Sequence, residues 1–281
     1  MSLPTMKHLV RGHNLVLLFP RQAGGDQLPL FVGKNIFTGR SVASVASITY
    51  GAPLYLEDSG EQHALLNVES KPNIDESIAS TIAKSAGFTY SPAGGDKNAV
   101  IGPSDIFYYC YATLYSPTFR SRYSEQLKLD YPRVPITSSG ELFKRLVALG
   151  NELVNLHLLG ENPFDSSKTI LDEPNKWGLK IDGAAPANLE DWKVTDVHYD
   201  AKEKRVYVNA GQYFEGVEKE VWEFMIGGYQ VCEKWLKDRK KAERALSTDD
   251  LKHYMKIVVA LRETIRIMGE IDQAIPSWPM K

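Results

Sequence analysis

The chain has 281 residues, a formal net charge of −2, 43% hydrophobic residues and 24% charged residues. This composition is typical of a globular protein with one or two domains. A charge so close to zero argues against a protein that coats nucleic acid, so any nucleic-acid contact requires a local basic patch. No apolar run is long enough to cross a bilayer, no secretory signal is evident, and Cys110 and Cys232 lie far apart. We therefore expect no membrane contact and a reducing, cytoplasmic location.

Residues 1–72 are predicted to form strands and loops. "NLVLLFP" (14–20) is a short apolar run closed by proline, which is typical of a buried strand. "RQAGGDQLP" (21–29) follows as a polar, glycine-rich loop. "SVASVASITYGAPLYL" (41–56) is rich in small and β-branched residues and predicts further strands.

Residues 73–160 have a helical pattern. In "NIDESIASTIAKSAG" three isoleucines recur at steps of four, with Asn73 as the predicted N-cap and Gly87 as the predicted end. Two more helices are predicted in residues 102–133, the first capped by Ser104. The second restarts at Ser116, a capping residue followed by proline at the first helical position.

A leucine stripe marks the next predicted helix, "ELFKRLVALGNELVNLHLLG" (141–160). Its leucines recur at alternating steps of four and three and so lie on one helix face, which needs a partner helix or sheet. The stripe consists of Leu142, Leu146, Leu149, Leu153 and Leu156.

Residues 161–228 are predicted to be largely extended. In "WKVTDVHYDAKEKRVYVN" (192–209), two alternating arms flank a charged turn, a pattern that predicts a hairpin. From Trp222 to Ile226, bulky apolar side chains alternate at a period of two, and Gly227-Gly228 would each cost a helix interior ~1 kcal/mol. The sequence therefore predicts a strand to Ile226, a glycine break and a helix from about Gln230.

Residues 229–281 are predicted to be C-terminal helices. Ser247, with Asp250 three residues later, resembles a capping box. Beyond it, apolar residues at helical spacing continue to about Ile271.

Catalytic motifs are missing from the sequence. It has neither G-x-x-x-x-G-K-[ST] nor G-x-G-x-x-G after a strand. Asn162-Pro163-Phe164-Asp165 is a distant parallel of the loop with which amino-methylating DNA enzymes hold a flipped base. It lacks the second proline, and a helix-terminating turn is the better interpretation. No catalytic residue and no metal ligand is assigned.

A metal-dependent nuclease is one alternative function. Asp182, Asp191 and Lys193 supply two acids and a lysine. Acid-x-Lys triplets are common, however, and the intervening "GAAPANLE" has the composition of a loop. This alternative requires the two carboxylates to converge.

A longer stretch carries a family resemblance. "DIFYYCYATLYSPTFRSRYSEQLKLDYPRVPIT" (105–137) resembles the C-terminal specificity region of single-chain type ISP restriction-modification enzymes and related adenine-specific DNA methylases. "LFKRLVALGNELVNLHLL", "RVYVNAGQYFEGVEKEVWEFMIGGYQVCEKWLKDRK" and "LSTDDLKHYMKIVVALRETIRIMGEID" continue the likeness in the same order. It covers residues 105–272 well and the first hundred residues loosely.

The resemblance implies a non-catalytic target-recognition region. In that family the methyltransferase, nuclease and helicase motifs lie upstream, and this sequence has none of them. The implied partners are double-stranded DNA and the upstream methyltransferase and nuclease domains of the same polypeptide. The resemblance implies no cofactor for this segment, because S-adenosylmethionine and Mg²⁺ would serve only the upstream domains.

Two kinds of DNA contact follow from this interpretation. Bases are read by side chains such as Arg on guanine and Asn or Gln on adenine, whereas phosphate contacts position the protein without reading sequence. The base-reading candidates are Arg21, Gln22, Lys34, Asn35, Arg40, Asn209, Gln212 and Tyr213. The phosphate candidates are Arg120, Arg122, Lys128, Lys234, Lys237 and Lys241. For each residue, the competing interpretation is an ordinary solvated loop or helix face.

The predicted fold is α+β, with a mostly antiparallel sheet region braced by several helices. We expect four parts: a strand- and loop-rich part (1–72), a helical part (73–160), a hairpin and strand part (161–228) and C-terminal helices (229–281). The predicted function is DNA target recognition within a restriction-modification enzyme. A second alternative is a structural docking module without direct DNA contacts, which would bury the loops of Arg21 and Lys34 against a partner protein.

Overall fold

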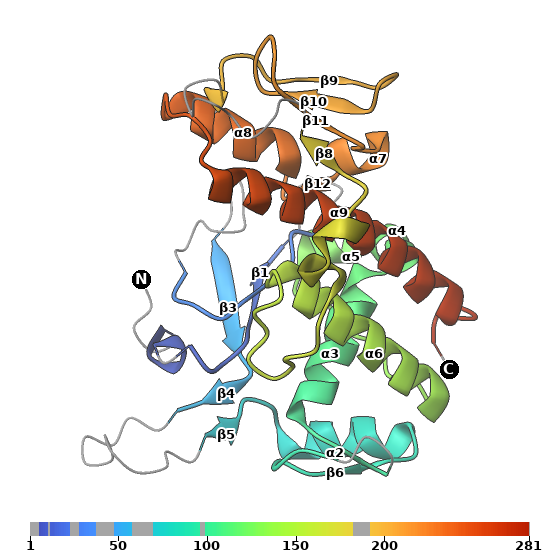
Figure 1. Cartoon of the computed structure of the whole chain (residues 1–281). Helices are drawn as coiled ribbons and strands as arrows, with labels where there is room; N and C mark the ends of the chain where they lie inside the picture. Colours follow the sequence, from blue (N-terminus) through green and yellow to red (C-terminus); the bar gives the residue numbers. More distant parts are fainter. Residues whose placement is uncertain are drawn as a thin grey trace. The chain divides into compact units, whose positions relative to one another are not determined.

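The structure is a computed structural model that describes residues 6–10, 12–22, 28–37, 48–57, 70–95, 99–181 and 192–280 (Figure 1). The chain divides into two compact units. Unit 1 comprises residues 1–166 and 267–281, and unit 2 comprises residues 167–266. Each unit has buried hydrophobic residues of its own.

The described strands of unit 1 form small sheets. Strand β1 (Val16–Pro20) pairs antiparallel with both β2 (Phe31–Gly33) and β3 (Thr49–Pro53), in the order β2-β1-β3. The strand predicted in "NLVLLFP" is therefore confirmed, and its alternate residues Val16 and Leu18 are buried. Two further strand pairs are β4 (Tyr55–Leu56) with β5 (Lys71–Pro72), antiparallel, and β6 (Thr89–Tyr90) with β7 (Val100–Ile101), parallel.

Helices α3 (Pro103–Tyr115) and α6 (Gly140–His157) lie alongside each other in unit 1 (Figure 1). The leucine stripe of α6 is buried, as predicted, and α3 is its partner helix. The two helices approach closely at Gly150, where a Cβ atom would lie 2.0 Å from the carbonyl oxygen of Tyr108. The other helical elements of the unit are η1 (Lys7–Leu9), α2 (Glu76–Ser85), α4 (Pro117–Arg122) and α5 (Ser124–Leu129).

Helix α2 begins two residues later than the predicted cap implies. Its N-cap is Asp75, whose Oδ1 accepts hydrogen bonds from the backbone N–H groups of Ser77 (2.9 Å) and Ile78 (3.1 Å). The Asn73 side chain instead donates to the carbonyl of Pro53 at 2.9 Å. The prediction of Asn73 as the cap was wrong because this amide is engaged by a strand that is distant in sequence.

Helix α3 also has a different cap from the one predicted. Gly102 occupies the N-cap position and Pro103 the first helical position, so Ser104 lies inside the helix. The carboxylate of Asp105 accepts a hydrogen bond from the N–H of Gly102 at 2.8 Å. The cap predicted at Ser116 for α4 is confirmed, since its hydroxyl accepts a hydrogen bond from a first-turn N–H at 3.0 Å.

The described strands of unit 2 form an antiparallel sheet in the order β8-β11-β10-β9. The predicted hairpin is confirmed by the pairing of β9 with β10. Val206 and Phe214 face the core, which α8 (Val231–Lys241) and the first part of α9 (Thr248–Ala274) cover (Figure 1). The strands are β8 (Lys180–Ile181), β9 (His198–Asp200), β10 (Arg205–Tyr207) and β11 (Tyr213–Glu215), preceded by the turns η2 (Ile170–Asp172) and η3 (Pro174–Lys176).

The strand predicted from Trp222 to Ile226 is wrong in its first part. Lys219–Trp222 form the one-turn helix α7, and only Met225–Ile226 are extended, as β12. Gly227 and Gly228 have φ values of +59° and +85° and form a turn that leads into β13 (Tyr229–Gln230). Positive φ at both central residues is what a two-residue hairpin turn of type I′ requires, and the glycines close the hairpin of β12 and β13. Helix α8 then begins close to the predicted start.

Helix α9 runs from unit 2 into unit 1 along the chain. The predicted capping box is confirmed: Asp250 accepts from the N–H of Ser247 at 3.0 Å, and Ser247 Oγ accepts from the N–H of Asp250 at 3.1 Å. The helix ends at Ala274, beyond the predicted end at Ile271. In the described part of the chain, no helix combines the length and apolarity needed to cross a membrane.

Candidate nucleic-acid interface

The end of β1 carries two of the base-reading candidates, Arg21 and Gln22. Gln22 Nε2 donates to the carbonyl of Leu129 at 2.8 Å, which fastens the end of β1 to the end of α5. Arg21 is exposed. Its Nε lies 3.7 Å from a carboxylate oxygen of Asp130, and its guanidinium lies 5.8 Å from the ring centroid of Tyr131. Gln22 therefore fixes the backbone at this point, and the neighbouring Arg21 side chain extends into solvent.

Tyr131, the ring beside Arg21, belongs to an aromatic cluster. Tyr131 makes edge-to-face contacts with Phe19 and with Tyr50, each with centroids 5.9 Å apart, and Phe19 and Tyr50 are directly paired between β1 and β3. Tyr50 and Tyr131 each remain 41% exposed. Tyr and Arg side chains are enriched among the residues that dominate protein–protein interfaces, and aromatic rings and Arg also stack on nucleic-acid bases. We call this set the Arg21 surface, defined by Phe19, Arg21, Tyr50, Asp130 and Tyr131.

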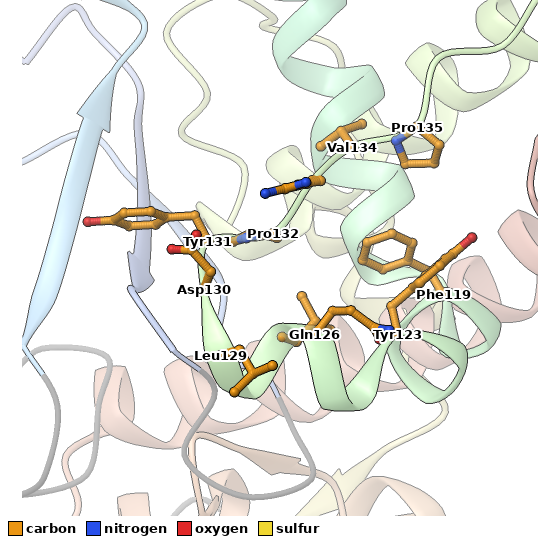
Figure 2. A pocket seen from close by; sticks show the side chains of 11 residues that line it. Phe119, Tyr123, Gln126, Leu129, Asp130, Tyr131, Pro132, Val134 and Pro135 are labelled. Atoms are coloured by element: carbon orange, nitrogen blue, oxygen red, sulfur yellow. The ribbon is translucent and has the colours of Figure 1, made fainter.

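A pocket of about 530 Å³ adjoins the Arg21 surface (Figure 2). Asp130 and Tyr131 lie at one end of it, and Tyr123 and Phe119 lie at the other. Leu129, which also lines the pocket, is 72% exposed. Most of the lining is aromatic or apolar, and Gln126, Asp130 and Arg133 add polar groups. Such a lining suits a planar or apolar part of a bound molecule that also carries polar atoms.

The loop after β2 holds the next candidates. Lys34 forms an ion pair with Glu161 at 2.6 Å, so its charge is already shared within unit 1. Asn35 is exposed. Arg40 lies outside the described residues.

In unit 2, Asn209 shapes the loop on which it lies. Its Oδ1 accepts hydrogen bonds from the N–H groups of Gly211 (2.9 Å) and Gln212 (2.8 Å), and its Nδ2 donates to the carbonyl of Lys193 at 3.0 Å. Such a side-chain turn is a frequent structural role of Asn. Because both ends of the amide are engaged, Asn209 is better described as a loop support, while Gln212 is half-buried beside it.

The solvent-facing side of the β8-β11-β10-β9 sheet carries a row of rings, of which only Tyr213 was among the predicted base-reading candidates. His198 stacks on Tyr207 at 4.6 Å, and Tyr207 contacts Tyr213 at 5.1 Å. Arg205 lies 4.3 Å from the Tyr213 ring centroid and pairs with Glu215 at 2.7 Å. Alternation with the buried Val206 was the signal that could have placed Arg205 and Tyr207 on this face.

The phosphate candidates of unit 1 differ in accessibility. Arg120 Nε donates to a backbone carbonyl near the end of α3 at 2.6 Å, and its guanidinium lies 4.5 Å from the ring centroid of Tyr115. Burial lowers the pKa of Arg120. This half-buried side chain is therefore held by contacts within unit 1. Arg122 is exposed, and Lys128 pairs with Glu125 at 3.0 Å.

The lysine stripe predicted on α8 exists. Lys234 pairs with Asp238 at 2.5 Å and Lys237 pairs with Glu233 at 2.9 Å, both across one helical turn, and Lys241 is exposed at the end of the helix. Exposed pairs of this kind contribute about 0–1 kcal/mol. A phosphate can therefore replace either carboxylate at little cost.

Two sequence features were considered for catalysis: the acids of the nuclease alternative and the turn at Asn162. Asp182 and Asp191 of the nuclease alternative lie outside the described residues. Across the described ranges, no group of three or more His, Cys, Asp or Glu side chains is arranged to hold a metal ion. Asn162 Oδ1 accepts from the N–H of Phe164 at 3.0 Å, and Asn162 is buried. These contacts support the predicted turn after α6.

Solved structures resemble this chain in fold. A type ISP restriction-modification enzyme, LlaBIII bound to DNA, matches with a TM-score of 0.64 and 16% identity over 95% of this chain and 16% of its own. A nuclease-deletion mutant of the type ISP enzyme LlaGI in complex with a DNA substrate mimic gives a TM-score of 0.59 and 15% identity, over 95% of this chain and 22% of its own. A DrdV–DNA complex matches with a TM-score of 0.58 and 19% sequence identity, covering 92% of this chain and 24% of the DrdV chain.

This chain therefore spans between about a sixth and a quarter of the length of those enzymes. A search of curated proteins found no match. The sequence model of the type ISP C-terminal specificity domain matches residues 1–270, which is nearly the whole chain, and confirms the resemblance inferred from the sequence. The chain belongs to the type ISP C-terminal specificity domain family.

Proposed function

We propose that this chain makes the sequence-specific contacts to double-stranded DNA within a restriction-modification enzyme. The observation that carries the proposal is the family match over residues 1–270. The structures that resemble this chain in fold are complexes with DNA or with a DNA substrate mimic. The neighbours are several times longer than this chain, so the contacts would serve catalytic domains elsewhere in the polypeptide.

The side chains divide into two proposed roles. Arg122, Lys128, Lys234, Lys237 and Lys241 would contact phosphates, because they are charged residues at or near the surface. Such contacts position the protein but carry no sequence information. Base reading is proposed for the remaining exposed or half-buried loop and strand-end candidates. These are Arg21, Lys34, Asn35, Gln212 and Tyr213.

Chemistry is proposed to lie outside this chain. Adenine methylation with S-adenosylmethionine, and cleavage with Mg²⁺, would belong to upstream domains, and the enzyme would act in the cytoplasm. Incubating the chain with labelled S-adenosylmethionine and DNA, and separately with Mg²⁺ and plasmid, tests this division. Methylation or cleavage that persists through repurification would contradict it.

DNA recognition itself is tested by selection from a pool of random-sequence duplexes. The chain should enrich one short sequence motif over several rounds. A pool that stays random while the chain remains folded, as judged by a cooperative thermal transition, would favour the docking-module alternative.

A further inference from the structure

We propose that Arg21 reads a guanine in the major groove and that Asp130 and Tyr131 are the positioning residues for this contact. The inference rests on the proposed function and deepens it. It concerns unit 1 alone, where Arg21, Asp130 and Tyr131 are all described.

The backbone around Arg21 is fixed from two sides. Arg21 follows Pro20, the last residue of β1, at a bend of the chain. Phe19 packs against the Tyr131 ring, which also lies beside the Arg21 guanidinium. The adjacent Gln22 is fastened to Leu129 at 2.8 Å. The arginine is therefore flanked by two anchored residues, and this reduces the freedom it would lose on binding.

One carboxylate and one aromatic ring lie beside the Arg21 guanidinium. Among the described residues, Asp130 is the only carboxylate within ion-pair distance of Arg21, and the approach is to Nε at 3.7 Å. Both side chains are more than half exposed, at 61% and 53%. Tyr131 lies under the guanidinium, with 5.8 Å to the ring centroid. At 3.7 Å the ion pair is longer than a hydrogen bond, so together with the ring it favours one orientation of the guanidinium without locking it. The carboxylate lies nearest to Nε, which leaves the two terminal nitrogens for a two-pronged contact.

The chemistry of a braced guanidinium selects guanine. Its two parallel N–H donors match the O6 and N7 acceptors that guanine presents in the major groove, whereas adenine presents a donor beside its acceptor. A lysine carries the same charge but lacks the planar fork. Lys34 is engaged by Glu161 at 2.6 Å, so Arg21 is the better placed of these two cations to read a base.

The experiment uses the motif that wild-type chain selects. Each guanine of that motif is replaced in turn by 7-deazaguanine, which lacks the N7 acceptor, and affinities are measured for wild type and Arg21→Lys. At one position the replacement should weaken wild type about 10-fold, the usual scale of a two-pronged contact. Arg21→Lys should already be about 10-fold weaker on the unmodified motif and should lose nothing more at that position. Its affinity for random duplex should be unchanged.

Positioning is tested by conservative variants. Asp130→Asn should lower the preference for guanine at that position several-fold, Asp130→Glu should restore most of it, and Tyr131→Phe should leave it intact. Arg122→Ala is the matched control, because it removes an exposed arginine from the same unit and should weaken binding to all duplexes alike. Thermal unfolding of each variant excludes a general loss of structure.

The outcomes separate the inference from the function. If wild type selects a motif but Arg21→Lys remains as sensitive as wild type to 7-deazaguanine at every position, the inference fails and the proposed function stands. If the selected motif contains no guanine, the inference likewise fails and the proposed function stands. If Asp130→Asn leaves guanine preference unchanged, the positioning role fails. If wild type selects no motif, both the inference and the proposed function are wrong.

Discussion

Asp272, near the end of α9, caps the start of α4 through Thr118. Its Oδ2 accepts hydrogen bonds from the backbone N–H of Thr118 at 3.0 Å and from the Thr118 hydroxyl at 2.7 Å. The hydroxyl of Ser116, the N-cap residue of α4, also contacts this carboxylate. The end of the chain's longest described helix thereby satisfies the exposed donors of a helix that begins about 150 residues earlier.

Removing this carboxylate should destabilise the protein. Asp272→Ala leaves the first-turn N–H of α4 without its side-chain acceptor and removes a negative charge from a helix N-terminus, so we expect a loss of about 1–2 kcal/mol. Thr118→Val removes only the hydroxyl bond and should cost less. Chemical denaturation measures both, and equal effects would show that the backbone bond contributes nothing.

The close approach of α3 and α6 predicts opposite results for one substitution at two glycines. Glycine to alanine normally stabilises a helix by up to about 1 kcal/mol. At Gly150 the new Cβ would meet the Tyr108 carbonyl, so Gly150→Ala should destabilise by about 1–3 kcal/mol. At Gly269 in α9 a Cβ meets nothing within 4 Å, so Gly269→Ala should be neutral or stabilising. Unfolding midpoints that fall equally for both variants would contradict this packing.

His157 predicts a loss of stability in acid. Burial, and secondarily the charge of Arg120, lower the pKa of His157 from 6.5 to about 3, and its Nδ1 lies 2.7 Å from the Tyr111 hydroxyl. Between pH 6.5 and 3 the unfolded chain binds a proton at this side chain that the folded protein does not. Lowering the pH through this window therefore favours unfolding, by up to about 1.4 kcal/mol per pH unit.

The measurement compares wild type with His157→Phe by denaturant unfolding between pH 7 and pH 4. The variant should be less stable at pH 7, because the Tyr111 hydroxyl loses one of its hydrogen-bond partners. Its stability should fall less steeply towards acid. Parallel pH profiles for the two proteins would mean that His157 titrates alike in both states.

The lysines of α8 should act on affinity and not on sequence preference. Lys237→Ala or Lys241→Ala should weaken binding to every duplex equally and reduce the log–log salt slope by about one for each lost phosphate contact. Lys219→Ala is the matched control, because this lysine is also exposed in unit 2 and is paired across one turn, with Glu223 at 3.7 Å. DNA titrations at several salt concentrations measure this slope. If the dependence of log affinity on log salt is unchanged in the α8 variants, α8 does not contact phosphates.

The sequence predicted elements well where one pattern extended over several turns. The predictions of the buried leucine stripe of α6 and of the Ser247 cap of α9 were both correct, because a long helical period and a capping pair can be recognised from residues close in sequence. Short patterns were less informative. The five residues from Trp222 comprise the last residue of the one-turn helix α7, two residues outside any helix or strand, and two extended residues. Ile78 of the predicted isoleucine series is 55% exposed.

The roles of single polar residues depended on contacts distant in the sequence. Arg120 lies over Tyr115, and Gln22 is fastened to Leu129, more than one hundred residues away. A sequence shows that these side chains can bind DNA but not that a carbonyl or ring of the same protein already holds them. The same reasoning explains why the brace around Arg21 could be found only in the fold.

The most direct test of the central claim is the ratio of affinities for the selected motif and for a scrambled duplex, measured with the 281-residue chain as salt is raised. Both affinities should fall with salt, because phosphate contacts are common to the two duplexes. The motif should remain at least about 1,000-fold preferred near physiological salt, as is typical of specific DNA readers. Equal affinities for the two duplexes at every salt concentration, with the chain folded, would contradict the account.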